Sequence, residues 1–246
     1  MFSFFGGKKI SKQEIVDRLA VDLHSHLIPG IDDGAQTLDE SIELIQNLST
    51  IGYKKLIITP HIMIDVYKNE EDNIIERLEI LKKAINKVGI DIDLEVAAEY
   101  YLDEGFLEHL NNKPLLIADE YLLFETSYMA KPMNLYDIVF EISSKGYKPI
   151  LAHPERYRYI HHLKREYSKL KDMGVFFQLD INSIGGFYGK DAQKKANFLI
   201  ESRMVDFVGS DTHNMRHIGN LNTTLSKMGS VWNKLFEHNT ILNNTL

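Results

Sequence analysis

The 246-residue sequence contains no cysteine. Disulfide bonds, zinc sites built on thiolates and catalysis by a cysteine nucleophile are therefore excluded. The chain also lacks any apolar run near the roughly 18 residues that a membrane span needs. Its opening, MFSFFGGKK, is apolar for only a few residues, too few for the core of a secretory signal. We therefore expect a cytoplasmic protein with no membrane span.

Positive charge is also scarce, with 28 Lys and Arg against 35 Asp and Glu and a formal net charge of -7. No basic block could follow a phosphate backbone, which weighs against nucleic acid as a partner. No Pro-rich or Ser-rich linker divides the chain, so we expect one domain spanning residues 1–246. Residues 1–17 are expected to form an N-terminal arm. Phe2, Phe4 and Phe5 in this arm would pack on the same subunit or on a neighbouring one, which leaves a homo-oligomer open.

Short β-type runs alternate with longer amphipathic helical patterns along the chain. The expected strands cover residues 18–23, 54–59, 92–98, 121–125, 148–152, 175–180 and 205–209. One helix is expected to begin with a capping box made by Thr37 and Glu40. Such alternation is typical of an α/β protein with a parallel sheet. A closed or nearly closed seven-stranded barrel is the favoured architecture, and an open doubly wound sheet is the alternative.

Side chains able to bind metal follow six of the seven expected strands. His24 and His26 come directly after the first strand, and residues at i and i+2 of an extended segment point the same way. The first loop and the ends of later strands supply Asp33, His61, Glu99, Glu125, His153, Asp211 and His213. The carboxyl ends of barrel strands meet at one mouth, where such folds hold their active sites. Any one of these residues alone would be an ordinary solvated or hydrogen-bonded loop residue, but nine together predict a metal centre.

The donor set narrows the choice of ion. Imidazoles and carboxylates without sulfur suit manganese, iron or zinc better than calcium or magnesium. Nine ligands are too many for one ion that must also bind substrate, so two or three ions are implied. Three divalent ions against four carboxylates would leave two positive charges, which matches a phosphate dianion, whereas two ions would leave none. This charge balance favours three ions and a phosphoester substrate.

Two arginines lie close to these ligands in the sequence. Arg156 follows His153 by three residues in the segment HPER, and its guanidinium suits phosphate oxygens. We expect it to bind phosphate, with a salt bridge to Glu155 as the alternative. Arg216 follows His213 by three residues and is a second candidate catalytic arginine. The glycine-rich segment at 183–189 lacks the spacing and the lysine of a P-loop, so we expect a flexible loop over the mouth.

The ordered motifs DLHSH, DDG, TPH, AAEY, LFET, AHPERY and GSDTHN resemble the PHP superfamily of metal-dependent phosphoesterases. Within it, they are most similar to bacterial protein-tyrosine phosphatases of capsule and exopolysaccharide synthesis. The resemblance covers residues 20–220, roughly, and implies a distorted (β/α)7 barrel of the PHP type that holds three metal ions, usually with manganese as the activating metal.

The resemblance also implies a distribution of ligands. The first ion would take His24, His26, Glu99 and Asp211; Glu99 would bridge to a second ion held by Glu125 and His153; the third would take Asp33, His61 and His213. Arg156 matches the phosphate-binding arginine of the family. The family often carries another active-site arginine in a short segment after the last motif, whereas here the segment NMRHIGN is brief and Arg216 lies closer to that motif, which leaves its role open.

The expected function is hydrolysis of protein phosphotyrosine by a metal-activated hydroxide. By resemblance, the substrate is the tyrosine-rich cytoplasmic tail of a polysaccharide-synthesis tyrosine kinase. One alternative keeps the barrel and metals but hydrolyses a small metabolite such as histidinol phosphate. A second alternative, of another class, is a metal-stabilised module that binds a partner without turnover.

Overall fold

The computed structural model describes residues 10–246, so the expected packing of Phe2, Phe4 and Phe5 lies outside the described part of the chain. The strands are β1 (Val21–Asp22), β2 (Lys55–Ile58), β3 (His61–Ile62), β4 (Asp93–Val96), β5 (Glu99–Tyr101), β6 (Tyr121–Glu125), β7 (Lys148–Ala152), β8 (Phe176–Asp180) and β9 (Phe207–Gly209). The α-helices are α1 (Lys12–Arg18), α2 (Leu38–Ile51), α3 (Glu71–Lys87), α4 (Phe106–Asn111), α5 (Leu135–Ser144), α6 (Leu163–Asp172), α7 (Ile181–Ile184), α8 (Lys190–Glu201), α9 (Met215–Lys227) and α10 (Gly229–His238). Two short 3-10 helices are η1 (Pro154–Arg156) and η2 (Asn243–Thr245).

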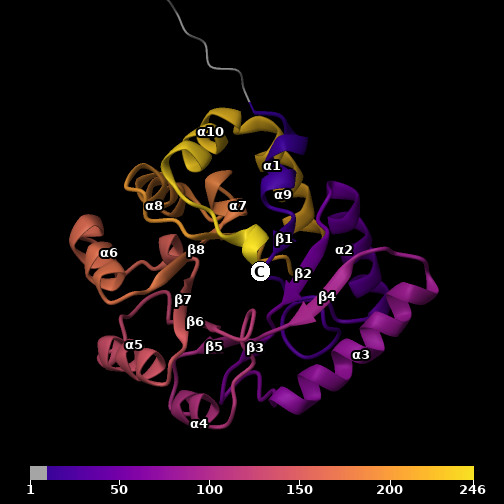
Figure 1. The fold of residues 1–246 in the computed structure, drawn as a ribbon, viewed down its shortest axis with the longest axis horizontal. Helices are drawn as coiled ribbons and strands as arrows, with labels where there is room; N and C mark the ends of the chain where they lie inside the picture. Colours follow the sequence, from indigo (N-terminus) through magenta and orange to yellow (C-terminus); the bar gives the residue numbers. More distant parts are fainter. Residues whose placement is uncertain (1–9) are drawn as a thin grey trace, which may run out of the picture.

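These strands form a closed ring of seven extended segments, with helices around the outside (Figure 1). Two of the segments are interrupted, so that β2 continues into β3 and β4 continues into β5. Backbone hydrogen bonds carry the pairing across both breaks, from Ala97 N to Ile58 O (2.9 Å) and from Glu99 N to Pro60 O (3.0 Å). A parallel bridge between Ser25 and Thr212 joins the first segment to the last. The expected (β/α)7 barrel is confirmed, and the open doubly wound sheet is excluded.

Alternation along the strands separates two apolar clusters. Leu123 and Phe207 belong to a small cluster inside the ring, whereas Leu122 and Phe177 join the larger core between strands and helices. Two residues beyond Leu123, on the same face, comes Glu125. The inner face is therefore apolar along most of its length and becomes polar where the strands end.

The C-terminal segment closes the opposite, amino-terminal end of the barrel. Leu242 and Leu246 pack against the inner cluster, and Figure 1 shows the chain end at the centre of the ring. The buried Asn243 side chain donates to Val21 O (2.9 Å) and Val208 O (2.7 Å) and accepts from Val208 N (3.0 Å). Within residues 10–246, the end of the barrel left uncovered by this segment is the mouth at the carboxyl ends of the strands.

Local structure departs from the sequence-based expectation at two places near the N-terminus. The expected strand at 18–23 begins only at Val21, because helix α1 extends to Arg18. Residues 12–17, which were expected to belong to an N-terminal arm, lie in this helix, and Ile15 and Val16 are buried. At α2, Thr37 caps the helix by accepting from Glu40 N (3.2 Å). The Glu40 carboxylate accepts from Gln36 N (2.7 Å) instead of the Thr37 backbone, so the expected capping box is only half formed.

Among residues 10–246, no helix has the length and apolar character that crossing a bilayer would require.

Candidate metal centre

The structure brings the nine predicted residues together at the carboxyl-end mouth of the barrel. His24 and His26 point toward one location, and their Nε2 atoms lie 3.2 Å apart. The same two atoms lie 3.1 Å and 3.4 Å from Oε2 of the buried Glu99. On the other side, Asp211 Oδ1 lies 3.3 Å from each of these Nε2 atoms. Two imidazole nitrogens therefore face two buried carboxylates.

Glu99 occupies the middle of the cluster. Its Oε1 lies 2.9 Å from His153 Nε2, and its Oε2 lies 3.2 Å from His61 Nδ1. His61 Nδ1 is also 3.2 Å from Glu125 Oε1. Because the two oxygens of Glu99 face different partners, this carboxylate can link separate cations, as the resemblance implies.

Asp33 and His213 complete the solvent side of the cluster. Asp33 is 54% exposed, and its Oδ1 lies 3.4 Å from His213 Nε2 and 3.5 Å from His61 Nε2. The His213 ring stacks on that of His26 with centroids 4.0 Å apart. This part of the mouth is open, so a substrate can approach the cluster from here.

The donor atoms fall into four overlapping groups whose members lie within 4.8 Å of one another. These are His26, Asp33, His61 and His213; His24, His153 and Asp211; His24, His26 and Glu99; and His61, Glu99 and Glu125. His153 groups with His24 and Asp211, and its Nε2 lies 3.8 Å from Glu125 Oε2. The groups therefore overlap the ligand sets that the resemblance implies without reproducing them.

The electrostatics of the cluster favour cations. Burial would lower the pKa of His24, but attraction to Glu99 and Asp211 outweighs it and raises the pKa to about 9. Burial would raise the pKa of Glu99, yet His24 and His61 hold it well below its ordinary value. The two Nε2 atoms, 3.2 Å apart and beside the carboxylates of Glu99 and Asp211, can share a cation. The residues present thus fit divalent metal ions by donor type, spacing and charge.

Two residues that the sequence analysis missed orient the central imidazoles. Asp32 Oδ2 lies 2.8 Å from His26 Nδ1, and Gln178 Oε1 lies 2.9 Å from His24 Nδ1. Both contacts fix the rings so that Nε2 faces the cluster, the role that outer hydrogen-bond partners have in metal sites. Gln178 comes from β8, the one strand without a predicted ligand. Its polar side chain on the inner face of β8, two residues beyond Phe176, was the available signal.

Two members of the cluster have a left-handed backbone. His153 has φ 34° and Asp211 has φ 48°, a region that residues with a Cβ atom rarely adopt. Such positions cost on the order of 1–3 kcal/mol each and persist where surrounding structure imposes them. Both residues lie just beyond strand ends, where the turn directs their side chains back into the mouth.

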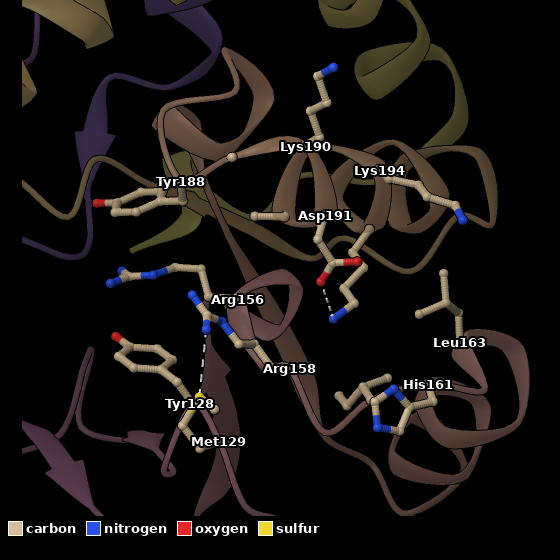
Figure 2. A pocket seen from close by; sticks show the side chains of 14 residues that line it. Tyr128, Met129, Arg156, Arg158, His161, Leu163, Tyr188, Lys190, Asp191 and Lys194 are labelled. Carbon is tan, nitrogen blue, oxygen red and sulfur yellow. Dashed lines mark hydrogen bonds and ion pairs between the residues drawn. The ribbon is translucent and has the colours of Figure 1, made fainter.

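Arg156 lies at the edge of the cluster. Its guanidinium pairs with Asp211 and lies 3.6 Å from Asp180 Oδ2. It is held between the rings of Tyr188 and Tyr128, with centroid distances of 4.1 Å and 4.8 Å (Figure 2). Arg156 therefore pairs with two aspartates instead of with Glu155, the alternative that the sequence left open.

Glu155 points away from Arg156 into the protein. It is fully buried, and its Oε1 accepts from Asp180 N at 3.2 Å. Burial raises its pKa to about 7. The HPER segment thus directs Glu155 into the interior and the next residue, Arg156, to the mouth.

Arg216 is exposed near the start of α9. Its guanidinium lies 4.8 Å from the centroid of the Phe187 ring. Within residues 10–246, its side chain makes no ion pair with the nine cluster residues, so the geometry gives no support to a catalytic role. The glycine-rich segment at 183–189 begins in α7 and then forms a loop that carries Phe187 and Tyr188 to the mouth.

Comparison with known proteins places this geometry in a family. The family model for capsular polysaccharide synthesis, CpsB/CapC, matches residues 20–240. The tyrosine-protein phosphatase YwqE of Bacillus subtilis (strain 168) is 30% identical over 198 residues, which cover 80% of this chain and 78% of YwqE. The putative tyrosine-protein phosphatase CapC of Staphylococcus aureus is 28% identical over 197 residues, covering 79% of this chain and 77% of CapC.

A solved structure gives the same result in three dimensions. It is described as belonging to the pair YwqE from Bacillus subtilis and CpsB from Streptococcus pneumoniae, "unique metal-dependent tyrosine phosphatases". It matches with a TM-score of 0.76 and 28% identity, and covers 90% of this chain and 96% of the other. Since the family model spans nearly all of the described residues, the chain belongs to the CpsB/CapC family of capsular polysaccharide synthesis proteins.

Proposed function

We propose that this protein is a metal-dependent protein-tyrosine phosphatase, a phosphoric monoester hydrolase. The observation that carries the proposal is the convergence of five imidazoles and four carboxylates on one mouth, directly beside the partly buried guanidinium of Arg156. The names of the relatives support the same activity.

The nine residues would hold two or three divalent ions. The mixed nitrogen and oxygen donors suit manganese, which we propose as the activating metal, and they also suit iron and zinc. When bound, such ions lower the pKa of a coordinated water toward neutrality and supply the nucleophile for attack on phosphorus. Asp32 and Gln178 contribute by keeping His26 and His24 in the orientation that binding requires.

Arg156 would bind the phosphate of the substrate. Its two faces are covered by Tyr128 and Tyr188, so the guanidinium edge remains to donate hydrogen bonds. An incoming phosphate can replace Asp211 as the partner of that edge, and the same hydrogen bonds then stabilise the charge on the equatorial oxygens during transfer. The leaving phenolate has a conjugate-acid pKa of about 10, so it departs with less need of protonation than an aliphatic alkoxide.

The substrate we propose is the phosphorylated tyrosine-rich tail of a tyrosine kinase of polysaccharide synthesis, and the location we propose is the cytoplasm. The support is the family match to capsular polysaccharide synthesis proteins. A phosphotyrosine side chain is long enough to reach a recessed centre from an otherwise extended peptide.

The test compares hydrolysis of a phosphotyrosine peptide and of histidinol phosphate by the purified protein, before and after chelation. We expect a clear preference for the peptide, loss of activity on chelation and recovery with manganese. The variant Glu99→Gln should remain inactive after manganese is returned, whereas Glu79→Gln on the exposed surface of α3 should recover fully. Preference for histidinol phosphate, or tight peptide binding without turnover, would overturn the proposal.

A further inference from the structure

A groove of about 820 Å³ lies beside Arg156 and apart from the nine-residue cluster. It is formed by the segment after β6, the segment from Arg156 to Leu163, and the first turns of α8 (Figure 2). None of the nine cluster residues lines it, but Arg156 and Tyr128 belong to both places, since the Tyr128 ring lies 5.6 Å from that of His153. Its volume falls in the range of ligand pockets, roughly 300–1,000 Å³.

The groove is basic although the protein is acidic. Its charged lining consists of Arg156, Arg158, Lys190, Lys194 and Lys195 against the single carboxylate of Asp191. Asp191 is already neutralised by Lys195 Nζ at 2.7 Å. Arg158, Lys190 and Lys194 are exposed and have no carboxylate partner among residues 10–246. An excess of positive charge therefore faces solvent here, in a chain whose net charge is -7.

Apolar side chains lie between these cations. Ile160, Leu163 and Ala192 line the groove, and the 66% exposed Met129 stands at its edge. Arg158 Nη1 approaches Met129 Sδ at 3.8 Å, and Lys195 Nζ donates to Tyr157 O at 2.8 Å. A groove that combines an apolar lining with unpaired cations suits a peptide whose side chains include carboxylates, because the apolar lining packs against the chain while the cations bind its charges.

We propose that this groove docks the residues that flank the phosphotyrosine of a protein substrate, and that it selects flanks containing aspartate and glutamate. The inference rests on the proposed phosphatase function, because Arg156 fixes the phosphate at one end of the groove. The occupant is an acidic polypeptide segment, for which the positive lining is complementary. We assign the discrimination to Arg158 and Lys194, two exposed cations that line the groove.

The test uses the full-length, manganese-loaded protein and two phosphotyrosine peptides. One peptide carries two acidic residues on each side of the phosphotyrosine, and the other carries the corresponding amides. The docking variant is Arg158→Gln with Lys194→Gln. Its matched control is Lys83→Gln with Lys87→Gln on α3, which removes the same charge on a distant side of the barrel (Figure 1).

We expect the wild-type protein to prefer the acidic peptide in kcat/KM. The docking variant should lose about three- to tenfold on the acidic peptide, the size of two exposed ion pairs, and should keep its rate on the amide peptide. The preference of the wild-type protein should also weaken as salt screens the charges. Equal melting temperatures are expected for all variants, since the replaced side chains are exposed.

Hydrolysis of p-nitrophenyl phosphate tests the phosphatase activity separately from docking in the groove, because this substrate has no flanking residues. If the wild-type protein fails to hydrolyse it and both peptides, the phosphatase proposal fails and the docking inference fails with it. If hydrolysis is normal but the acidic peptide is not preferred, or the preference survives in the docking variant, only the docking inference fails. Binding of phosphatidylglycerol vesicles that the docking variant loses, without a change in peptide kinetics, would assign the groove to a lipid surface and would also overturn the inference.

Discussion

Replacing Asp32 with asparagine changes one atom behind His26 and leaves the shape of the side chain nearly unchanged. Asp32 is 7% exposed, and the three groups that its carboxylate contacts can all act as donors. Oδ2 lies 2.8 Å from His26 Nδ1 and accepts from His61 N at 3.2 Å, while Oδ1 accepts from Gly34 N at 2.9 Å. An amide offers only one oxygen, so its NH2 group must face at least one of these donors.

The expected effect is weaker metal binding with the fold retained. The charge-assisted hydrogen bond to His26 contributes about 1.5–3 kcal/mol. A substitution at such an outer partner typically lowers metal affinity about 10- to 100-fold. That loss equals roughly 1.4–2.8 kcal/mol, so the two routes to the magnitude agree.

Titration of chelator-treated protein with manganese, followed by calorimetry or by the EPR signal of the free ion, measures the change. Asp91→Asn, at an exposed position before β4, is the matched control and should bind as the wild type does. An Asp32→Asn protein with an unchanged circular dichroism spectrum and an affinity within about threefold of the wild type would refute the orienting role of Asp32, since loss of such an outer hydrogen-bond partner lowers metal affinity by more than that.

Three further predictions follow from the same structure. Arg156→Lys should lower kcat/KM for an aryl phosphate about 10²- to 10³-fold, because lysine cannot donate two parallel hydrogen bonds as a guanidinium does. The control Arg165→Lys on α6 should have no effect, and equal rates for Arg156→Lys and the wild type would contradict the phosphate-binding role. Leu123→Ala, fully buried inside the barrel, should lower the free energy of unfolding by about 2–5 kcal/mol in urea denaturation, compared with less than about 0.5 for the 44% exposed Leu107→Ala. Burial raises the pKa of Glu155 from 4.5 to about 7, so the folded state keeps this proton longer than the unfolded state does. The contribution of this group to the free energy of unfolding is complete below pH 4.5, and about 3 kcal/mol of it is lost as the pH rises to about 7. In the metal-free protein, Glu155→Gln should therefore reduce the dependence of the free energy of unfolding on pH over this range. Parallel curves of stability against pH for the two proteins would contradict the prediction.

The convergence of the cluster could be predicted because it depends on strand ends and on alternation. His24 and His26 share a direction through their i, i+2 spacing, and Glu125 continues the inner face of β6 beyond Leu123. Parallel strands bring such positions to one mouth irrespective of loop detail. This part of the site required only the order of strands and helices.

The division of roles within the first loop could not be predicted. Asp32 and Asp33 are adjacent and chemically identical, yet one is buried behind His26 and the other is half exposed at the mouth. The loop passes so close to His26 that a Cβ atom on Gly34 would lie 2.1 Å from the His26 carbonyl oxygen. That close approach sets which carboxylate turns inward, and it is a tertiary feature that residue spacing does not encode.

The closure of the barrel floor was equally inaccessible from the sequence. Asn243 binds Val21 O across 222 residues of chain, and no local pattern distinguishes it from its neighbour Asn244. The ion-pair partner of Arg156 could not be predicted either, because it also depends on contacts between segments that are far apart in the sequence. Whether Glu155 or an aspartate from another strand lies next to the guanidinium depends on the direction in which η1 leaves β7.

The left-handed backbone at His153 and Asp211 has a consequence for anyone who selects this protein for heat resistance. Glycine adopts that conformation without steric penalty, so His153→Gly and Asp211→Gly would relieve the chain at the two positions where the catalyst needs a side chain. A library screened on melting temperature alone would therefore enrich inactive clones at these two sites, and thermal endurance and turnover would have to be selected together.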